Sequence, residues 1–345
     1  MTDAAVTLAG IRETRARLGD RVHHTPLLSS ATAARVAGEA SGVRLADGRI
    51  YLKAEHLQQT GSFKPRAALS RIEALTPDER RRGAITISAG NAGQAYAWAG
   101  REAGVPVTVV MPAGAVASKV AACLDYGAEV VLHGTHVGEA MARMHELVEE
   151  RGLTIVHPYD QPEVLLGNGS CGLELLEDLP DVDVVVMGVG GGGLIGGVTV
   201  ALKEARPSVR VYGVEPVGSE AMTQGLAAGE PVTVTPVSVA DGLGAPIVGR
   251  LALDVARRYL DGVVLVGDPT ILGGLRFAVE RLKQVLEPAG SAALAAVLTG
   301  AVPLRDGDRV AVVLSGGNVA TERLGDLLAA ATPIPPVPPI AAAGT

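Results

Sequence analysis

The feature that most constrains the fold of this chain is a repeated succession of short apolar segment, turn and helical segment. The apolar segments are rich in Val and Ile and lack the polar alternation of half-exposed strands. Helical stretches such as Thr135–Arg151 and Pro269–Gln284 lie between most of them. Strands of this kind, separated by helices, predict parallel sheets with helices on both faces. The predicted strands are Ala84–Ile87, Val107–Met111, Glu129–Leu132, Thr154–His157, Val182–Val189, Val209–Val214, Gly262–Val266 and Arg309–Leu314.

The predicted strands form two groups, one before and one after about residue 155. A chain of 345 residues with 48% hydrophobic residues is long enough for two cores. We therefore predict an α/β fold with two open, mostly parallel, twisted sheets flanked by helices. The proline-rich segment 331–345 has little to bury and is predicted to be disordered. Because the pattern continues to about residue 330, we expect no appended regulatory domain.

Composition excludes several classes of function. A net charge of −7 and only 3% aromatic residues give no basis for nucleic-acid binding. The apolar run Val182–Val189 is too short to cross a membrane, and the charged N-terminus lacks a signal peptide. Cys123 and Cys171 are far apart, which fits a reducing compartment. We expect a cytoplasmic enzyme that acts on a small molecule, with no nucleic-acid or membrane partner.

A run of glycines follows the strand Val182–Val189 and precedes a helical stretch. Gly190–Gly193 allow successive backbone N–H groups to converge on one anion at a helix N-terminus, which predicts a phosphate site. Gly188, Gly190 and Gly193 also satisfy G-x-G-x-x-G, and Glu215 ends the next strand as a ribose-binding acid would. A dinucleotide site therefore stays open, as does a glycine-rich turn without a ligand.

Lys64 lies in the segment T-G-S-F-K-P-R, at the predicted start of a helix for which Ser62 is the expected N-cap. The positive end of a helix and a low dielectric both lower the pKa of an amine, which makes it a better nucleophile toward an aldehyde. A Schiff-base lysine is one interpretation. An ordinary surface lysine is the other.

Two further polar turns follow predicted strands. Ser88–Gln94 (SAGNAGQ) connects a strand to a helix, where backbone amides suit a carboxylate and Asn91 could hydrogen-bond a polar ring substituent. Ser315–Asn318 (SGGN) follows the strand near the C-terminus. In parallel sheets the carboxyl ends of strands are where ligands bind. Simple helix capping and a tight turn are the alternatives for these two segments.

Four motifs in this order, TGSFKPRA, SAGNAGQ, GGGGL and LSGGN, resemble those of fold-type II pyridoxal-phosphate (PLP) enzymes. The resemblance covers roughly residues 5–320 and is strongest to the threonine/serine dehydratase (ammonia-lyase) branch, which is related to serine racemase. It implies a fold similar to the tryptophan synthase β subunit. It also implies a large PLP-binding domain of residues 1–67 and 156–330, and a small domain of residues 68–155 that closes over the active site.

The resemblance also assigns roles to residues. It makes Lys64 the catalytic lysine that bonds to PLP, Asn91 the contact to the ring oxygen, and Ser315 the residue beside the ring nitrogen. A neutral serine leaves that nitrogen mostly unprotonated, which favours β-elimination. The cofactor phosphate would be held by Gly190, Gly191, Gly192, Gly193 and Leu194, and the substrate carboxylate by Ser88, Ala89, Gly90 and Asn91.

The implied activity is β-elimination and deamination of L-threonine, L-serine or both, giving 2-oxobutanoate or pyruvate and ammonia. The implied assembly is a homodimer or homotetramer. Racemisation, β-replacement and elimination from a bulkier 3-hydroxy amino acid stay open as alternatives. So do an NAD-binding oxidoreductase and a PLP-binding protein without catalysis.

This chain departs from the family pattern at several positions. Ala89 stands where serine racemase has a second catalytic serine, so we expect weak racemisation. Ala92 replaces a common histidine, and Pro65 follows the lysine directly. Some relatives hold a divalent cation near the residue that matches Glu215, but Ala221 replaces the second carboxylate. We expect no metal, with Glu215 as the single candidate ligand.

Overall fold

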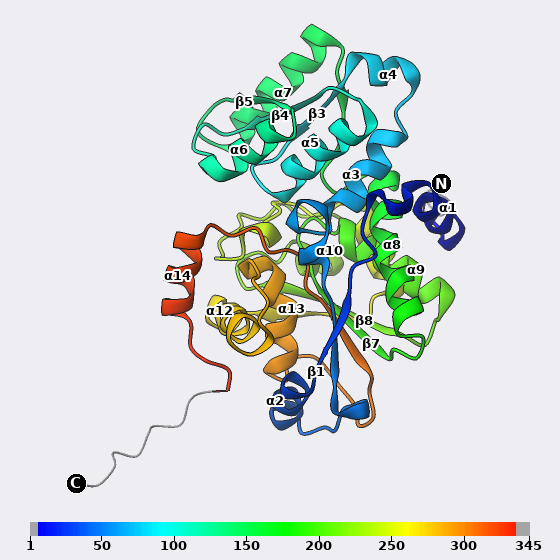
Figure 1. Ribbon diagram of the computed structural model, residues 1–345, viewed down its shortest axis with the longest axis vertical. Helices are drawn as coiled ribbons and strands as arrows, with labels where there is room; N and C mark the ends of the chain where they lie inside the picture. The colour runs from blue at the N-terminus through cyan, green and yellow to red at the C-terminus, as the bar shows by residue number, and fades with distance from the viewer. Residues whose placement is uncertain (1–5, 336–345) are drawn as a thin grey trace, which may run out of the picture.

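The computed structural model describes residues 6–335 and contains two separate sheets (Figure 1). The larger sheet has the strand order β1-β2-β10-β7-β8-β9, in which only β1 runs antiparallel to its neighbour. The smaller sheet has the order β5-β4-β3-β6 and is entirely parallel. The strands are β1 (Leu27–Ser30), β2 (Ile50–Lys53), β3 (Ala84–Ile87), β4 (Val107–Met111), β5 (Glu129–Leu132), β6 (Thr154–Ile155), β7 (Val184–Gly188), β8 (Arg210–Pro216), β9 (Gly262–Val266) and β10 (Val310–Val313).

Helices connect nearly all of these strands. The α-helices are α1 (Leu8–Leu18), α2 (Ala31–Ser41), α3 (Lys64–Glu73), α4 (Pro77–Arg82), α5 (Asn91–Ala103), α6 (Ala117–Asp125), α7 (Val137–Arg151), α8 (Pro162–Asp178), α9 (Gly193–Ala205), α10 (Ala221–Ala228), α11 (Arg250–Tyr259), α12 (Asp268–Phe277), α13 (Pro288–Leu298) and α14 (Thr321–Ala330). Shorter helical turns are η1 (Gly19–Arg21), η2 (Ala46–Gly48), η3 (Glu55–Leu57), η4 (Gln59–Gly61), η5 (Asp241–Leu243) and η6 (Ala278–Leu282).

The predicted fold class is confirmed, and all eight predicted strands are present, with ends that differ by up to two residues. The prediction missed β1 and β2, the pair that forms one edge region of the larger sheet. These strands are short, and β1 (LLSS) carries two serines in place of an apolar run. These two segments form strands because they pair with segments that are distant in the sequence. Ile50 of β2, for example, lies opposite Val310 of β10.

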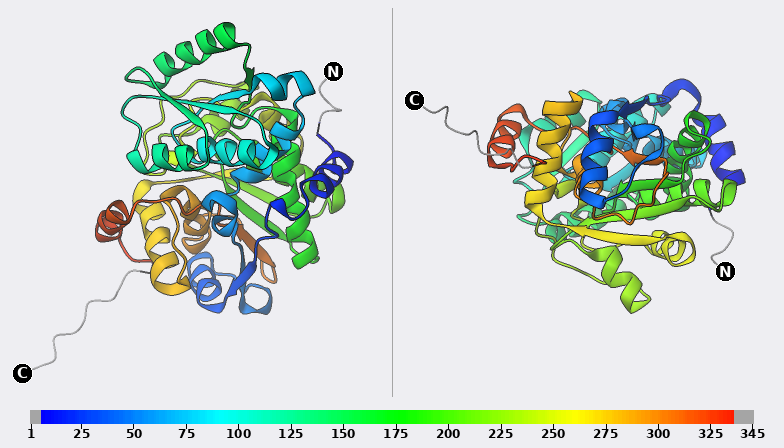
Figure 2. Two further views of the ribbon diagram at one scale, coloured as in Figure 1. Left: turned by 45° about the horizontal axis from the view of Figure 1, so that its top comes forward. Right: turned by 90° about the horizontal axis from the view of Figure 1, so that it is seen from below.

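The larger sheet is covered on both faces, which explains why its strands read as continuous apolar runs. Val184 and Val186 of β7 belong to a core shared with α2, α12 and α13. Their neighbours Val185 and Met187 belong to a second core with α8, α9 and α11. Successive side chains of a strand point to opposite faces, so each strand contributes to both cores. Figures 1 and 2 show the helices on the two sides of this sheet.

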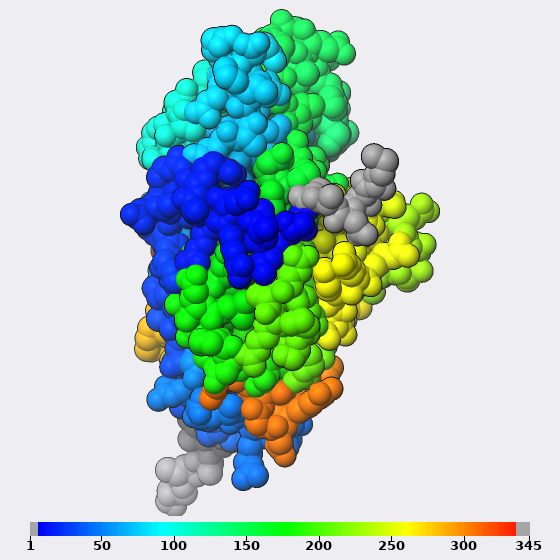
Figure 3. All heavy atoms as spheres, turned by 90° about the vertical axis from the view of Figure 1, so that its right-hand side faces the viewer, coloured from blue at the N-terminus to red at the C-terminus, as the bar shows by residue number. Residues whose placement is uncertain are grey.

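The smaller sheet is also covered on both faces, by α5 and α6 on one side and α7 on the other. Helix α3 packs against α5 of the smaller unit and against α8 of the larger one. It therefore lies between the two sheets (Figure 1). The N-terminal helix α1 lies on α8 and α9 at the surface (Figure 3).

The C-terminal segment follows α14. Of residues 331–345, for which the sequence predicts disorder, the structure describes residues 331–335, and Ala331 and Ile334 of this segment contact α12. Ala331 is buried and accepts a hydrogen bond from Arg276, and Ile334 lies against Gly273. Residues 336–345 lie outside the described part of the chain. Within residues 6–335, no helix combines the length and apolar character needed to cross a membrane.

Candidate active site

Lys64 is the first residue of α3, where the sequence predicts it. Its side chain is partly buried, and its Nζ lies 3.3 Å from the carbonyl oxygen of Pro158 and 4.9 Å from the centre of the Phe63 ring. Burial lowers the pKa of Lys64 to about 8, against the opposing effect of the Glu287 carboxylate. Pro65 occupies the second helical position, where a helix needs no N–H donor. Lys64 therefore has the properties of an amine that is partly neutral near physiological pH.

The prediction that Ser62 caps α3 is wrong. Phe63 occupies the N-cap position without a side-chain hydrogen bond, and Ser62 instead pairs through its backbone with Gly316. The chain reaches α3 through a left-handed turn, with φ of 58° at Thr60 and 74° at Gly61. The buried hydroxyl oxygens of Thr60 and Ser62 have no hydrogen-bond partner within residues 6–335. The entrance to α3 thus leaves unsatisfied polar atoms beside Lys64.

The predicted glycine loop connects β7 to α9, and Gly193 is the first residue of that helix. Gly192 has φ of 92°, and no side chain caps the first turn of α9. A Cβ atom on Gly191 would lie within 2.5 Å of the Tyr159 ring, and one on Gly193 would lie 2.9 Å from the Tyr159 carbonyl oxygen. Only glycine fits this loop, whose helix N-terminus can bind an anion.

The four predicted motifs lie close together, as contacts of residues within them or next to them show. The backbone N–H of Phe63, next to Lys64, donates to the carbonyl oxygen of Ser315 at 3.1 Å. A Cβ atom on Gly316 would lie 3.3 Å from Asn91 Nδ2. Pro158 contacts Lys64, and the adjacent Tyr159 lies against Gly191. The carboxyl ends of β3, β7 and β10 therefore meet at the start of α3.

The segment Ser88–Asn91 connects β3 to α5, as predicted. Gly90 is the N-cap residue, and α5 has no side-chain cap. Ser88 Oγ accepts a hydrogen bond from the N–H of Gly90 at 3.2 Å, and Ala89 is exposed. In the described part of the chain, the N–H groups of Asn91 and Ala92 in the first turn of α5 have no acceptor, and such groups suit a carboxylate.

The sequence analysis assigned no role to several residues that line this region, although one of them, Asn318, belongs to the predicted SGGN turn. Glu287, at the N-cap of α13, accepts a hydrogen bond from Asn91 Nδ2 at 2.6 Å. Asn318 donates to Asn91 Oδ1 at 3.0 Å. The ring of His157, which stacks edge-on against Tyr159, accepts the N–H of Asp160. The stretch EPAGSAALAA contains Glu287, but apolar alanines around it gave no indication of a polar partner.

Glu215 lies apart from this group of residues, at the end of β8. Its carboxylate accepts hydrogen bonds from Met222 N at 2.7 Å, Thr223 N at 2.9 Å and Thr223 Oγ1 at 2.7 Å. Burial raises its pKa, and the Thr223 hydroxyl opposes that shift. Glu215 thus caps α10. Among the described residues, no three His, Cys, Asp or Glu side chains are placed to hold a metal ion together.

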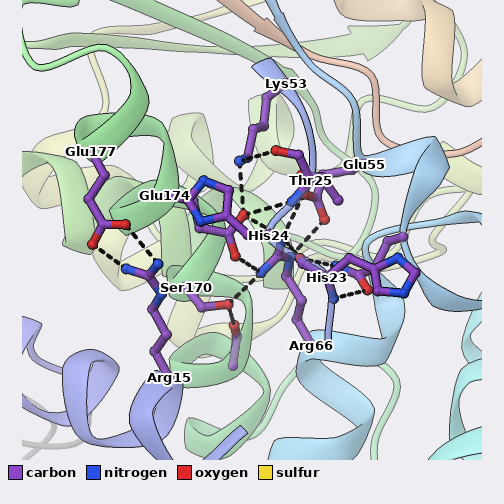
Figure 4. A network of polar contacts seen from close by, with 12 residues as sticks. Arg15, His23, His24, Thr25, Lys53, Glu55, Arg66, Ser170, Glu174 and Glu177 are labelled. Atoms are coloured by element: carbon purple, nitrogen blue, oxygen red, sulfur yellow. Dashed lines mark hydrogen bonds and ion pairs between the residues drawn. The ribbon is translucent and has the colours of Figure 1, made fainter. Parts of the chain in front are cut away.

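A buried ion network lies behind the start of α3 (Figure 4). Arg66, which is 0% exposed, donates to both carboxylate oxygens of Glu55 and of Glu174. Lys53 Nζ lies 2.8 Å from Glu174 and donates to the carbonyl oxygen of Thr25. The network joins α3 to β2, η3, α8 and the segment before β1.

Comparison with known proteins agrees with this geometry. Residues 20–316 match the family model described as "Pyridoxal-phosphate dependent enzyme". The chain is 41% identical to the L-threonine ammonia-lyase of Thermotoga maritima, over 91% of this chain and 76% of that one. It is 38% identical to the catabolic L-threonine dehydratase TdcB of Escherichia coli K12, over 94% and 97% of the two chains.

A solved structure also resembles this one. Maize serine racemase superposes with a TM-score of 0.87 at 33% identity, over 93% of this chain and 96% of that chain. The predicted resemblance to the threonine/serine dehydratase branch and its racemase relatives is confirmed. Together with a half-buried lysine, a glycine loop at a helix N-terminus and a serine beyond β10, these matches show that the chain belongs to the family of pyridoxal-phosphate dependent enzymes.

Proposed function

We propose that this enzyme eliminates water from L-threonine, L-serine or both, and that the resulting enamine takes up one water to give 2-oxobutanoate or pyruvate and ammonia. The observation that carries this proposal is Lys64, an amine of lowered pKa at the point where the glycine loop, Asn91 and Ser315 converge. The names of the two bacterial relatives support the threonine substrate.

The residues present fit PLP. No side chain caps the first turn of α9, so the backbone N–H groups of the loop Gly190–Leu194 suit the phosphate. Ser315 can hydrogen-bond the ring nitrogen through a neutral hydroxyl, and Asn91 can donate to the ring oxygen. The unpaired hydroxyls of Thr60 and Ser62 are consistent with a polar ligand beside Lys64.

When bound, PLP supplies the electron sink that stabilises negative charge at the substrate Cα. The protein contributes the remaining parts. Lys64 Nζ, once free of the cofactor, is the base that removes the Cα proton, since a pKa near 8 leaves part of it neutral at pH 7. The segment Ser88–Asn91, in which the N–H groups of Ala89 and Asn91 donate to no acceptor within residues 6–335, holds the substrate carboxylate and fixes which bond at Cα faces Lys64.

Racemisation is the second candidate, because maize serine racemase has a similar structure. Inverting Cα requires a proton donor on the face opposite Lys64. Ala89, at the position where serine racemase has a second catalytic serine, has no ionisable or hydroxyl group. We therefore propose elimination as the main reaction.

The proposal extends to the assembly, domains and location of the enzyme. We propose a homodimer or homotetramer, supported by exposed Val217, Val237 and Leu265 on or beside the edge strand β9. A large domain of residues 1–67 and 156–330 and a small domain of residues 68–155 are supported by the membership of the two sheets. Buried free thiols at Cys123 and Cys171 support the cytoplasm.

Turnover measurements test the proposed reaction. Keto-acid formation from L-threonine and L-serine should be measurable with the PLP-loaded wild type. Lys64→Ala should reduce it by about 10²–10⁴-fold or more, because it removes the base. Lys283→Ala, at an exposed lysine, is the control and should retain activity. Undiminished turnover by Lys64→Ala would exclude the mechanism, and D-serine formation as fast as elimination would favour the racemase.

A further inference from the structure

The carboxylate of Glu287 occupies a fixed and almost completely buried position next to Asn91. Glu287 is 4% exposed, and its Oε1 accepts the Asn91 Nδ2 hydrogen bond at 2.6 Å. Two glycines, Gly316 and Gly242, leave room for the Glu287 carboxylate. A Cβ atom on Gly316 would lie 2.5 Å from Oε1, and one on Gly242 would lie 3.6 Å from it. The space around this carboxylate is therefore shaped by backbone on two sides.

A chain of hydrogen bonds determines how the Asn91 amide is oriented. Asn318 Nδ2 donates to the Thr60 carbonyl oxygen at 2.7 Å and to Asn91 Oδ1 at 3.0 Å, which uses both of its N–H groups. Asn91 Oδ1 is thus an acceptor, and one Asn91 N–H is given to Glu287. Since an ionised carboxylate can only accept, the amide cannot be reversed without breaking both contacts. The second N–H of Asn91 has no acceptor within the described residues 6–335.

We propose that Glu287 is a positioning residue that fixes the Asn91 amide so that its free N–H faces the ring oxygen of bound PLP. This inference rests on the proposed function, which places Asn91 at that oxygen. Glu287 acts through Asn91 and has no assigned contact with the substrate. Removing its carboxylate should change how PLP is held without removing Lys64 or the glycine loop.

The charged groups that face Glu287 come from three elements. They are Lys64 on α3, Lys119 on α6 and Asp241 on η5. Burial raises the pKa of Glu287 to about 7, with Lys119 lowering it and Asp241 raising it further. Above this pKa the carboxylate accepts from Asn91 Nδ2. Below it the protonated carboxyl can donate as well as accept, so Glu287 no longer fixes the Asn91 amide and the contact with Asn318 alone opposes its reversal.

Cofactor affinity is the first test. Glu287→Ala removes the acceptor, and Glu280→Ala removes an exposed carboxylate in the preceding segment as a control. Titration of each apoprotein with PLP, followed by fluorescence, should show affinity about tenfold or more weaker for Glu287→Ala and unchanged for Glu280→Ala. Wild-type affinity in Glu287→Ala would overturn the inference.

Glu287→Gln is the second test and keeps the size and the carbonyl acceptor of the side chain. It should bind PLP within about threefold of the wild type. The absorbance of PLP in the wild type should show a transition near pH 7 that Glu287→Gln lacks. The same transition in Glu287→Gln would contradict the proposal, even if Glu287→Ala failed to fold. A wild-type protein that bound no PLP would instead overturn the proposed function, and this inference with it.

Discussion

At the scale of single residues, the central property is the protonation of Lys64. An unperturbed lysine amine is almost entirely charged at pH 7 and therefore a poor nucleophile. In this protein burial brings its pKa from 10.5 to about 8, although Glu287 opposes the shift. The neutral fraction at pH 7 is then roughly 300-fold larger than at the ordinary pKa. Burial thus activates Lys64 before any ligand binds.

The pH dependence of PLP uptake tests this property. The uptake rate of the apoprotein should rise with pH through about 8 and level off above about 9, because Lys64 is then almost fully deprotonated. Stopped-flow absorbance from pH 6 to above 10 measures it, with Nα-acetyl-lysine as a reference amine for changes in PLP itself. If the uptake rate of the apoprotein instead kept rising up to the pH at which the rate of the reference amine levels off, the pKa of Lys64 would not be lowered.

At the scale of elements, α3 is held in place by the ion network around Arg66 (Figure 4). Burial alone would raise the pKa of Glu55, but the adjacent Arg66 guanidinium holds it below its usual value. The ionised carboxylate therefore stabilises the fold fully above pH 4.5, and this contribution is lost as the pH falls through the lower folded pKa. The network fixes the helix that carries Lys64 to both β2 and α8.

Substitution of Arg66 tests the network. Arg66→Met leaves Glu55 and Glu174 buried without their main partner, so unfolding free energy should fall by about 3–5 kcal/mol. Arg15→Met, which breaks the more exposed pair with Glu177, should cost about 0–1 kcal/mol and serves as the control. Urea denaturation at pH 7 measures both. Equal losses in the two variants would mean that the buried network contributes no more than a surface pair.

At the scale of the whole molecule, the sequence predicts the two-sheet fold because strands buried on both faces are apolar throughout. It does not predict β1 and β2, since their pairing with β10 depends on contacts between distant segments. The same limit applies to the site. Lys64 and Gly190–Leu194 carry local signals, such as a helix start and consecutive glycines. Glu287 and Tyr159 come to the site only through tertiary packing, and nothing in their immediate sequence indicates it.

The proposed chemistry depends on PLP being bonded to Lys64, which stands at the start of α3 between the two sheets. Reduction of the PLP-loaded protein with borohydride makes that bond permanent, and peptide mapping by mass spectrometry then locates it. We predict that the label is found on Lys64 and is lost in Lys64→Ala. A label on another lysine, or none on a protein that turns over L-threonine, would contradict the account.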